Sequence, residues 1–176
     1  IYPGCGYGGS CFPKDIKALI NMANNNGYKP SLISSVDQVN NTQKELLFNK
    51  IKKYFKNNIK GKVFAIWGLS FKPETDDMRE APSINLIKSL INAGCVVNAY
   101  DPKAIKEARF YLKDLSVNYF KDKYSVLDKA DVLVLVTEWK EFRSPDFNKI
   151  KDYMRGNLIV DGRNQYQTDF IEGIGF

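Results

Sequence analysis

The chain of 176 residues is long enough for one ordinary domain with an additional segment, because single domains usually hold about 100–150 residues. Hydrophobic residues make up 44% and charged residues 26%, which is the balance of a globular protein rather than of a disordered chain. The formal net charge of +6 would suit nucleic acid or a phosphorylated small molecule. The lysines are scattered, however, and no nucleic-acid-binding module can be recognised, so we expect no nucleic-acid partner.

Nothing in the sequence predicts a membrane protein or a metal site. No apolar run reaches the roughly 18 residues that a membrane-spanning helix needs, and residues 1–14 lack the apolar centre of a signal peptide. The odd number of cysteines, at positions 5, 11 and 95, fits reduced thiols, so we expect a cytoplasmic protein. The chain has no histidine and no C-x-x-C pair, which removes Cys–His catalysis and argues against a zinc site. It begins with Ile1 inside a glycine-rich motif, which we interpret as a fragment of a longer protein.

The first third of the chain predicts two helices after a glycine-rich loop over residues 1–12. The first covers 13–24, because Pro fits an initial helical turn and Asn24 to Gly27 form a stop signal. The second runs from Ser31 to about Phe55 and would exceed about 30 Å. Its apolar stripe comprises Ile33, Val36, Val39, Leu46, Leu47, Ile51 and Phe55. Such a helix could present a partner surface or be an ordinary core helix.

Beyond a linker at residues 57–61, expected strands alternate with expected helices. The strands are predicted at 63–67, 95–100, 116–119, 132–136 and 158–160, and the helices at 83–93, 103–112, 124–130 and 145–154. This alternation predicts an α/β fold with a parallel, doubly wound sheet, on which ligands bind at the carboxyl ends of the strands. We therefore divide the chain into a helical region, 1–60, and a Rossmann-like parallel-sheet domain, 61–176.

The opening loop, Gly4-Cys5-Gly6-Tyr7-Gly8-Gly9, formally matches the dinucleotide motif G-x-G-x-x-G. That motif needs a strand directly before it and an acidic residue about 20 positions later, closing a second strand. Only Ile1-Tyr2-Pro3 precede the loop and the stretch that follows it is helical, so we do not interpret the loop as a dinucleotide site. Its glycines would let the backbone approach a ligand closely, or would simply make the loop flexible.

Cys11 is the candidate nucleophile. It stands where a helix is expected to begin, and a helix N-terminus stabilises a thiolate. Lys14 adds a nearby cation, and Asp15 could position a water molecule or a lysine. For an isolated cysteine at such a place, a buried structural role is the more common case. A redox pair of Cys5 and Cys11 is a further, weaker alternative.

Five stretches, in order along the chain, resemble the UDP-glucose/GDP-mannose dehydrogenase family. They are Gly8-Gly9-Ser10-Cys11-Phe12-Pro13-Lys14-Asp15, the stretch from Gly68 to Ser83, Tyr100-Asp101-Pro102, Thr137-Glu138-Trp139 with Phe142, and Asp161-Gly162-Arg163-Asn164. Together they span nearly the whole chain, and the first and fourth are most similar to the members that oxidise UDP-glucose. A GDP-mannose or an N-acetylated substrate remains the alternative within this family.

The resemblance implies a two-step oxidation of a sugar's primary alcohol to a carboxylate with two molecules of NAD. Cys11 matches the family's nucleophile, which forms a thiohemiacetal and then a thioester. Asp15 matches the aspartate that assists the catalytic water, and Lys14 matches a residue on the NAD side. Arg79 matches an arginine that reaches NAD, and an ion pair with Glu80 or Asp76 is its alternative role.

The resemblance also implies which residues bind the nucleotide sugar. They are the backbone of the loop from Tyr2 through Gly4 to Gly8, the pair Phe71 and Lys72, and Arg163. Lys72 alone would be read as a solvated loop lysine. For Asp101 and Glu138, a turn-forming role is more common than a functional one. Cys5 and Cys95 are interpreted as structural.

Two further expectations follow from the resemblance. The long helix over 31–56 corresponds to the dimer core of family members, so we expect a homodimer. The family's N-terminal NAD-binding domain is missing from the chain, so we expect the chain alone to be inactive. A non-catalytic module for nucleotide-sugar binding and dimerisation is the second class of function that the sequence allows.

Overall fold

The computed structural model describes residues 3–176, which form helices around one sheet. The α-helices are α1 (Phe12–Asn25), α2 (Ser31–Tyr54), α3 (Pro82–Asn92), α4 (Ile105–Tyr111), α5 (Phe147–Tyr153) and α6 (Thr168–Gly173). The strands are β1 (Val63–Trp67), β2 (Val96–Tyr100), β3 (Val117–Tyr119), β4 (Val132–Leu135) and β5 (Leu158–Asp161). Two 3₁₀ helices, η1 (Ser125–Leu127) and η2 (Lys140–Phe142), complete the elements.

The five strands form one parallel sheet in the order β3-β2-β1-β4-β5. The α/β fold class and the parallel sheet expected from the sequence are therefore confirmed. The order reverses at β1, whose neighbours β2 and β4 continue in opposite directions. In sheets of this kind the loops that diverge at the reversal leave a crevice at the carboxyl ends of the strands, where ligands bind.

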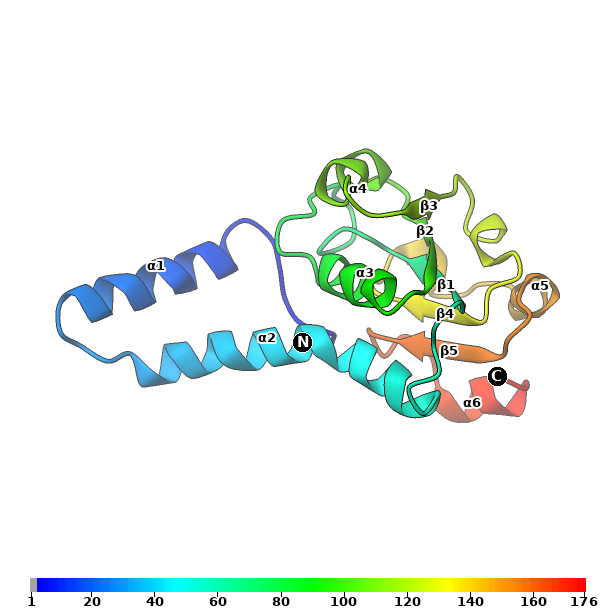
Figure 1. Cartoon of the computed structure of the whole chain (residues 1–176), viewed down its shortest axis with the longest axis horizontal. Helices are drawn as coiled ribbons and strands as arrows, with labels where there is room; N and C mark the ends of the chain where they lie inside the picture. The colour runs from blue at the N-terminus through cyan, green and yellow to red at the C-terminus, as the bar shows by residue number, and fades with distance from the viewer. Residues whose placement is uncertain (1–2) are drawn as a thin grey trace.

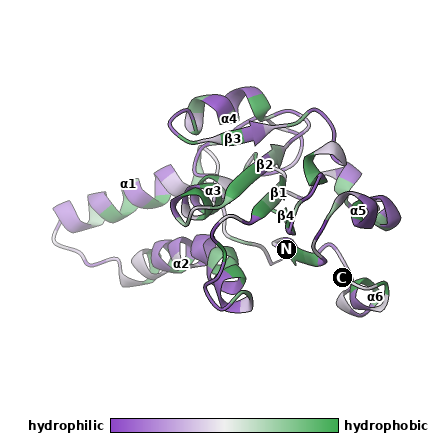
Figure 2. Ribbon diagram, turned by 45° about the vertical axis from the view of Figure 1, so that its right-hand side comes forward, coloured by the Kyte–Doolittle hydropathy of each residue, from purple (hydrophilic) through white to green (hydrophobic). Residues whose placement is uncertain are grey.

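The sheet is covered on both faces, because successive strand residues point to opposite sides. Phe64 and Ile66 of β1 pack into a core with α2, α3 and α4. Ala65 and Trp67 pack into a second core with η1, η2 and α5. Figure 2 shows β1, β2 and β4 as hydrophobic ribbons inside the more polar helices. Burial on both faces explains the nearly continuous apolar strands in the sequence.

The helices α1 and α2 extend beyond the sheet as an arm, running side by side (Figure 1). The carboxyl-terminal half of α2 lies on the α/β body through Leu47 and Ile51, which are buried with α3. The amino-terminal half leaves Val36 and Val39 exposed. The single apolar stripe seen in the sequence thus serves two surfaces, one inside the body and one on the arm.

Two differences from the sequence-based elements have simple causes. The helix expected over 124–130 is only the 3₁₀ helix η1, and Lys129, just beyond it, has a left-handed φ of 54° that no helix continues. The helix α6 was not expected, since its six residues are too few to show an apolar period. Among residues 3–176, no helix combines the length and apolar character needed to cross a bilayer.

Candidate functional site

Arg163 lies at the carboxyl ends of the central strands and joins three loops there. Its Nε donates a hydrogen bond to the carbonyl oxygen of Val136, after β4, at 2.6 Å. The same nitrogen lies 3.0 Å from Oε2 of Glu138, and Nη2 donates at 3.5 Å to the carbonyl oxygen of Phe71, after β1. The structure therefore brings Arg163 and Phe71 together, as a shared role in substrate binding requires.

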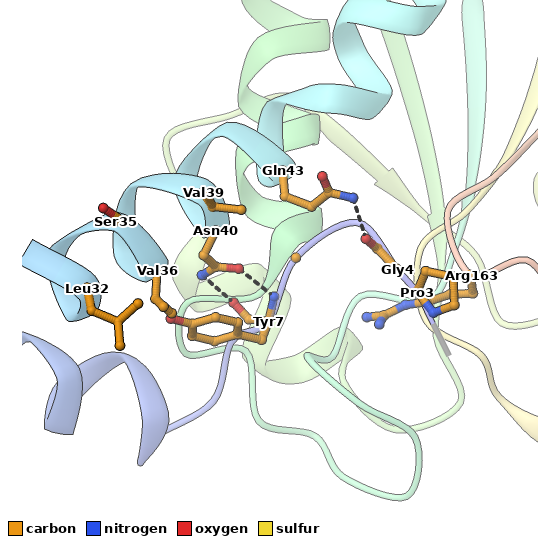
Figure 3. A pocket seen from close by; sticks show the side chains of 11 residues that line it. Pro3, Gly4, Tyr7, Leu32, Ser35, Val36, Val39, Asn40, Gln43 and Arg163 are labelled. Carbon is orange, nitrogen blue, oxygen red and sulfur yellow. Dashed lines mark hydrogen bonds between the residues drawn. The ribbon is translucent and has the colours of Figure 1, made fainter. Parts of the chain in front are cut away.

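Gly4 also lies against Arg163, beside an open cavity of ≈ 570 Å³ (Figure 3). A Cβ added to Gly4 would approach Nη1 of Arg163 to 2.8 Å, so a side chain here would displace the guanidinium. The cavity is lined by the loop over residues 3–7, by α2 and by Arg163. Cys11, Phe71 and Lys72 do not line it, so it covers only one side of the expected substrate site.

The glycine-rich loop crosses the body between α2 and the segment after β1. The N–H of Gly9 donates to the carbonyl oxygen of Arg79 at 2.7 Å. A side chain on Gly8 would overlap the carbonyl group of Glu80, and one on Gly9 would meet the ring of Phe71. In the described part of the loop no strand precedes the glycines, and α1 follows them. That this loop is not a dinucleotide site stays a prediction, and its glycines serve close backbone packing.

Cys11 and Asp15 lie on one side of the first turn of α1. Cys11 is the N-cap residue and is exposed, and its Sγ lies 3.6 Å from Oγ of Ser10. Four residues along the helix place Asp15 on the same face, and both line a shallow pocket of ≈ 290 Å³. Nζ of Lys14 pairs with Asp15 at 3.2 Å, with both side chains in solvent. An exposed thiol with a carboxylate one turn away is the arrangement that the proposed chemistry needs.

Two further cations expected in the site have partners within the segment after β1. Arg79 binds Asp77 through Nη2 at 2.7 Å, which lowers the pKa of Asp77 and raises the pKa of Arg79. The ion-pair partner that the sequence suggested, Glu80 or Asp76, is therefore wrong. Lys72 makes a cation–π contact, with Nζ 5.5 Å from the ring centre of Phe71, and no ion pair with a described residue. Its charge remains available to a phosphate.

The other two cysteines are structural, as expected. Cys5 is buried between the loop and β4, and its thiol faces the carbonyl oxygen of Val136 at 3.9 Å. Burial raises the pKa of Cys5, and burial raises the pKa of Cys95 to about 11. Thiols with raised pKa values are poor nucleophiles at neutral pH. This leaves Cys11 as the exposed cysteine of the chain.

Asp101 has the turn-forming role that is common after a strand. Its buried carboxylate accepts hydrogen bonds from the N–H groups of Leu69 and Ala104 and from Nε1 of Trp139, at 2.7, 2.8 and 3.0 Å. It thereby ties together the loops that follow β1, β2 and β4. Such a saturated carboxylate is not free to act on a substrate.

Sequence reasoning missed the polar side chains that hold the glycine-rich loop. Asn40 and Gln43 of α2 bind the backbone of the loop, and Lys44 binds Glu80 across it. The available signal was periodicity, because positions 40, 44, 47 and 51 all share the buried face of α2. An asparagine or a lysine on an otherwise apolar helix face indicates a hydrogen-bond or ion-pair partner, because burying a polar group without one is costly.

The predicted site residues that the structure describes fall into two groups. Gly4, Phe71 and Arg163 gather on the body, while Cys11 and Asp15 lie at the base of the arm. Tyr2 falls outside the described residues, so its predicted role stays a prediction. Over residues 3–176, no group of three or more acidic or cysteine side chains is arranged to hold a metal ion.

Comparisons with known proteins match both parts of the chain. The UDP-binding domain model of the UDP-glucose/GDP-mannose dehydrogenase family matches residues 65–168, and the central-domain model of the same family matches residues 1–42. The chain is 46% identical to a UDP-glucose 6-dehydrogenase of Pseudomonas aeruginosa over all of its length, and 39% identical to the one of Rhizobium meliloti. In both cases it spans 40% of the length of the relative.

Solved structures with the same architecture support this assignment. A UDP-glucose dehydrogenase of Pyrobaculum islandicum superposes with a TM-score of 0.83 at 31% identity, covering 94% of this chain and 36% of that one. A GDP-mannose dehydrogenase of Pseudomonas aeruginosa gives 0.76 at 26% identity, covering 93% and 37%. Because the family's UDP-binding domain model alone accounts for more than half of the residues, this chain belongs to the UDP-glucose/GDP-mannose dehydrogenase family.

Proposed function

We propose that this chain is the nucleotide-sugar-binding and nucleophile-bearing part of an NAD-dependent UDP-glucose 6-dehydrogenase. In this proposal, residues 1–60 supply the cysteine and the dimer surface, and residues 61–176 bind the UDP-sugar. The observation that carries the proposal is the position of Cys11. It is the exposed cysteine, directly beside a loop whose glycines pack against the strand ends of a UDP-binding fold.

The proposed chemistry balances through the thiol of Cys11. The alcohol at C6 of glucose loses a hydride and a proton and becomes an aldehyde. The sulfur adds to the aldehyde carbon, and the oxygen takes a proton, giving a thiohemiacetal. Loss of a second hydride and a proton gives a thioester, which water cleaves to the carboxylate and the free thiol. Asp15, one helical turn from Cys11, is the group that we expect to orient this water.

Cations near Cys11 and at the strand ends suit the two phosphorylated molecules that this reaction requires, NAD and the sugar nucleotide. Two molecules of NAD, bound in turn, would each accept one hydride. Lys14 is exposed on the first turn of α1, and Arg79 lies within electrostatic range of Cys11, so both suit the pyrophosphate of NAD. Lys72 and Arg163 lie at the strand ends and suit the diphosphate of the sugar nucleotide.

We propose a homodimer formed through the arm. Leu32 is 79% exposed and Val39 66% exposed on the amino-terminal half of α2, and Phe12 and Met22 of α1 are exposed too. Exposed large apolar side chains gathered on one element usually mark an interaction surface. Light scattering on the purified chain tests this, and a monomeric mass at micromolar concentration would exclude it.

Calorimetric titration of the chain with UDP-glucose, GDP-mannose and NAD tests the proposed substrate. We expect binding of UDP-glucose alone. Binding of GDP-mannose alone would instead favour the alternative substrate of the family. A second assay follows NADH formation with UDP-glucose and NAD, where we expect no turnover by the 176-residue chain. Binding of a UDP-sugar by a complete enzyme that never forms NADH would favour the non-catalytic module.

A further inference from the structure

The backbone of the glycine-rich loop is held by two carboxamide side chains of α2. The N–H of Tyr7 donates to Oδ1 of Asn40 at 2.8 Å, and Nδ2 of Asn40 donates back to the carbonyl oxygen of Tyr7 at 3.1 Å. Nε2 of Gln43 donates to the carbonyl oxygen of Gly4 at 2.7 Å. Figure 3 shows both side chains pointing from α2 toward the loop. Asn40 thus pairs with both backbone groups of one residue, as a neighbouring β-strand would.

The loop approaches α2 so closely that only a glycine fits between them. Gly6 has φ = 105°, a conformation that side chains disfavour. A Cβ there would lie 2.9 Å from Cγ of Lys44 and 3.1 Å from Oδ1 of Asn40. Asn40 is itself buried, so its carboxamide would be unsatisfied without the peptide of Tyr7. The loop and α2 therefore fit each other in two ways: the glycine allows their close approach, and the backbone of Tyr7 satisfies the buried carboxamide of Asn40.

On the opposite side, the loop is fixed to the segment that follows β1. Gly9 donates to the carbonyl oxygen of Arg79, and Gly8 packs on the backbone of Glu80. Tyr7 is held from α2 and Gly9 from the body, and Cys11 follows two residues later. A shift of Tyr7 toward solvent would pull the start of α1, and with it the thiol, away from the strand ends.

We propose that Asn40 is a positioning residue for Cys11, assisted by Gln43. The two carboxamides fix the loop backbone, and the loop fixes where the thiol lies relative to Arg79 and the strand ends. This inference rests on the proposed role of Cys11 as nucleophile. The hydrogen bonds of the Asn40 side chain go to the backbone of Tyr7, so Asn40 acts through the loop.

A nitroxide label on Cys11 tests the proposal in the chain as it stands. Cys5 and Cys95 are buried, so the label attaches selectively to the exposed thiol. In the Asn40→Leu variant we expect the mobile component of the electron paramagnetic resonance spectrum to rise about 10-fold, the change that corresponds to losing roughly 1.4 kcal/mol of restraint. Gln43→Leu removes one hydrogen bond instead of two, so we expect a smaller rise. Amide exchange at Tyr7 should accelerate as well, with exchange in β1 unchanged.

Asn41→Leu is the matched control, because Asn41 is the neighbouring asparagine on the same helix and its side chain donates a hydrogen bond to Asp37 within α2, not to the loop. If the labelled Asn40→Leu and Gln43→Leu proteins give the spectrum of Asn41→Leu, Asn40 only stabilises the fold and the proposal is wrong. Should Asn40→Leu not fold, Gln43→Leu decides the question alone. The label reports how firmly the side chain at position 11 is held, and it does not report turnover. This result is therefore independent of the UDP-glucose titration that tests the proposed function.

Discussion

The α/β body and the helical arm with its glycine-rich loop are held together by different forces. Inside the body, apolar side chains on both faces of the sheet are fully buried. The loop and the start of α1 are instead fixed by hydrogen bonds from Asn40 and Gln43 and by ion pairs to Glu80. Apolar burial makes the body tolerant of changes in charge. The polar attachment makes the position of the proposed nucleophile sensitive to single substitutions that leave the body intact.

The largest expected effect is in the body. Phe64 of β1 is 0% exposed, and Phe64→Ala should lower the free energy of unfolding by about 3–5 kcal/mol through lost burial and the cavity left behind. Urea unfolding measures this change. Phe110→Ala is the control, because Phe110 is 69% exposed on α4 and should change stability by at most about 0.5 kcal/mol. Equal losses of unfolding free energy in the two variants would contradict the conclusion that buried apolar side chains hold the body together.

The second-largest loss of stability is expected at the junction between the arm and the body. Nζ of Lys44 is 3.0 Å from Oε2 of Glu80, and the lysine side chain is 3% exposed. Glu80→Gln leaves this buried ammonium without its anion and should cost about 1–3 kcal/mol at neutral pH, since the carboxylate itself is partly solvated. Glu74→Gln is the control, because it breaks only the exposed pair with Lys103.

The same pair should give a pH dependence. Hydrogen bonds from Lys17 and Lys44 lower the pKa of Glu80 below its ordinary value of 4.5. A carboxyl whose pKa is depressed by folding stabilises the folded state above the unfolded pKa, and this contribution disappears as the pH falls through the folded pKa. The stability difference between the native sequence and Glu80→Gln should therefore shrink below about pH 4. A difference that stays constant down to pH 2 would exclude this ion pair as its source.

Lys72 tests the ligand-binding end of the body. Its ammonium has no carboxylate partner within 4.0 Å among the described residues, so Lys72→Met should not alter the fold. If Lys72 binds the diphosphate, the substitution should raise the dissociation constant for UDP-glucose about 10-fold, the loss of one charge-assisted hydrogen bond. Calorimetry with Lys60→Met as the control decides this, because Lys60 lies before β1 at the opposite end of the sheet. Unchanged affinity would remove Lys72 from the site.

The smallest effect is expected from the exposed contact between α1 and the body. Nζ of Lys17 binds Oε1 of Glu80 at 2.8 Å, and both side chains are about half exposed. Lys17→Met should change stability by only about 0–1 kcal/mol, and less in high salt. Thermal unfolding at low and high salt measures this, with Lys17→Arg expected to match the native sequence. A cost above about 2 kcal/mol would mean that the arm depends on this pair more than an exposed contact allows.

The sequence predicted the sheet and the longer helices of the body well, because these elements carry local signals. The five consecutive branched aliphatics from Val132 to Val136 predict a buried strand, and β4 occupies that place. Gly94 ends α3 just before β2, as helix stop signals require. The helix over 31–55 was also correct, although its apolar stripe could not reveal that Leu47 faces the body while Val39 faces solvent. One periodic pattern is compatible with either surface.

The sequence by itself determined the parallel α/β fold and the candidate nucleophile Cys11, because strand–helix alternation and the Gly8 to Asp15 motif are continuous along the chain. Only the tertiary structure decided how the loop is held. Asn40 and Tyr7 are separated by 33 positions, and Lys44 and Glu80 by 36. Hydrogen bonds and ion pairs between distant segments depend on where the fold places their backbones, and no local periodicity encodes them.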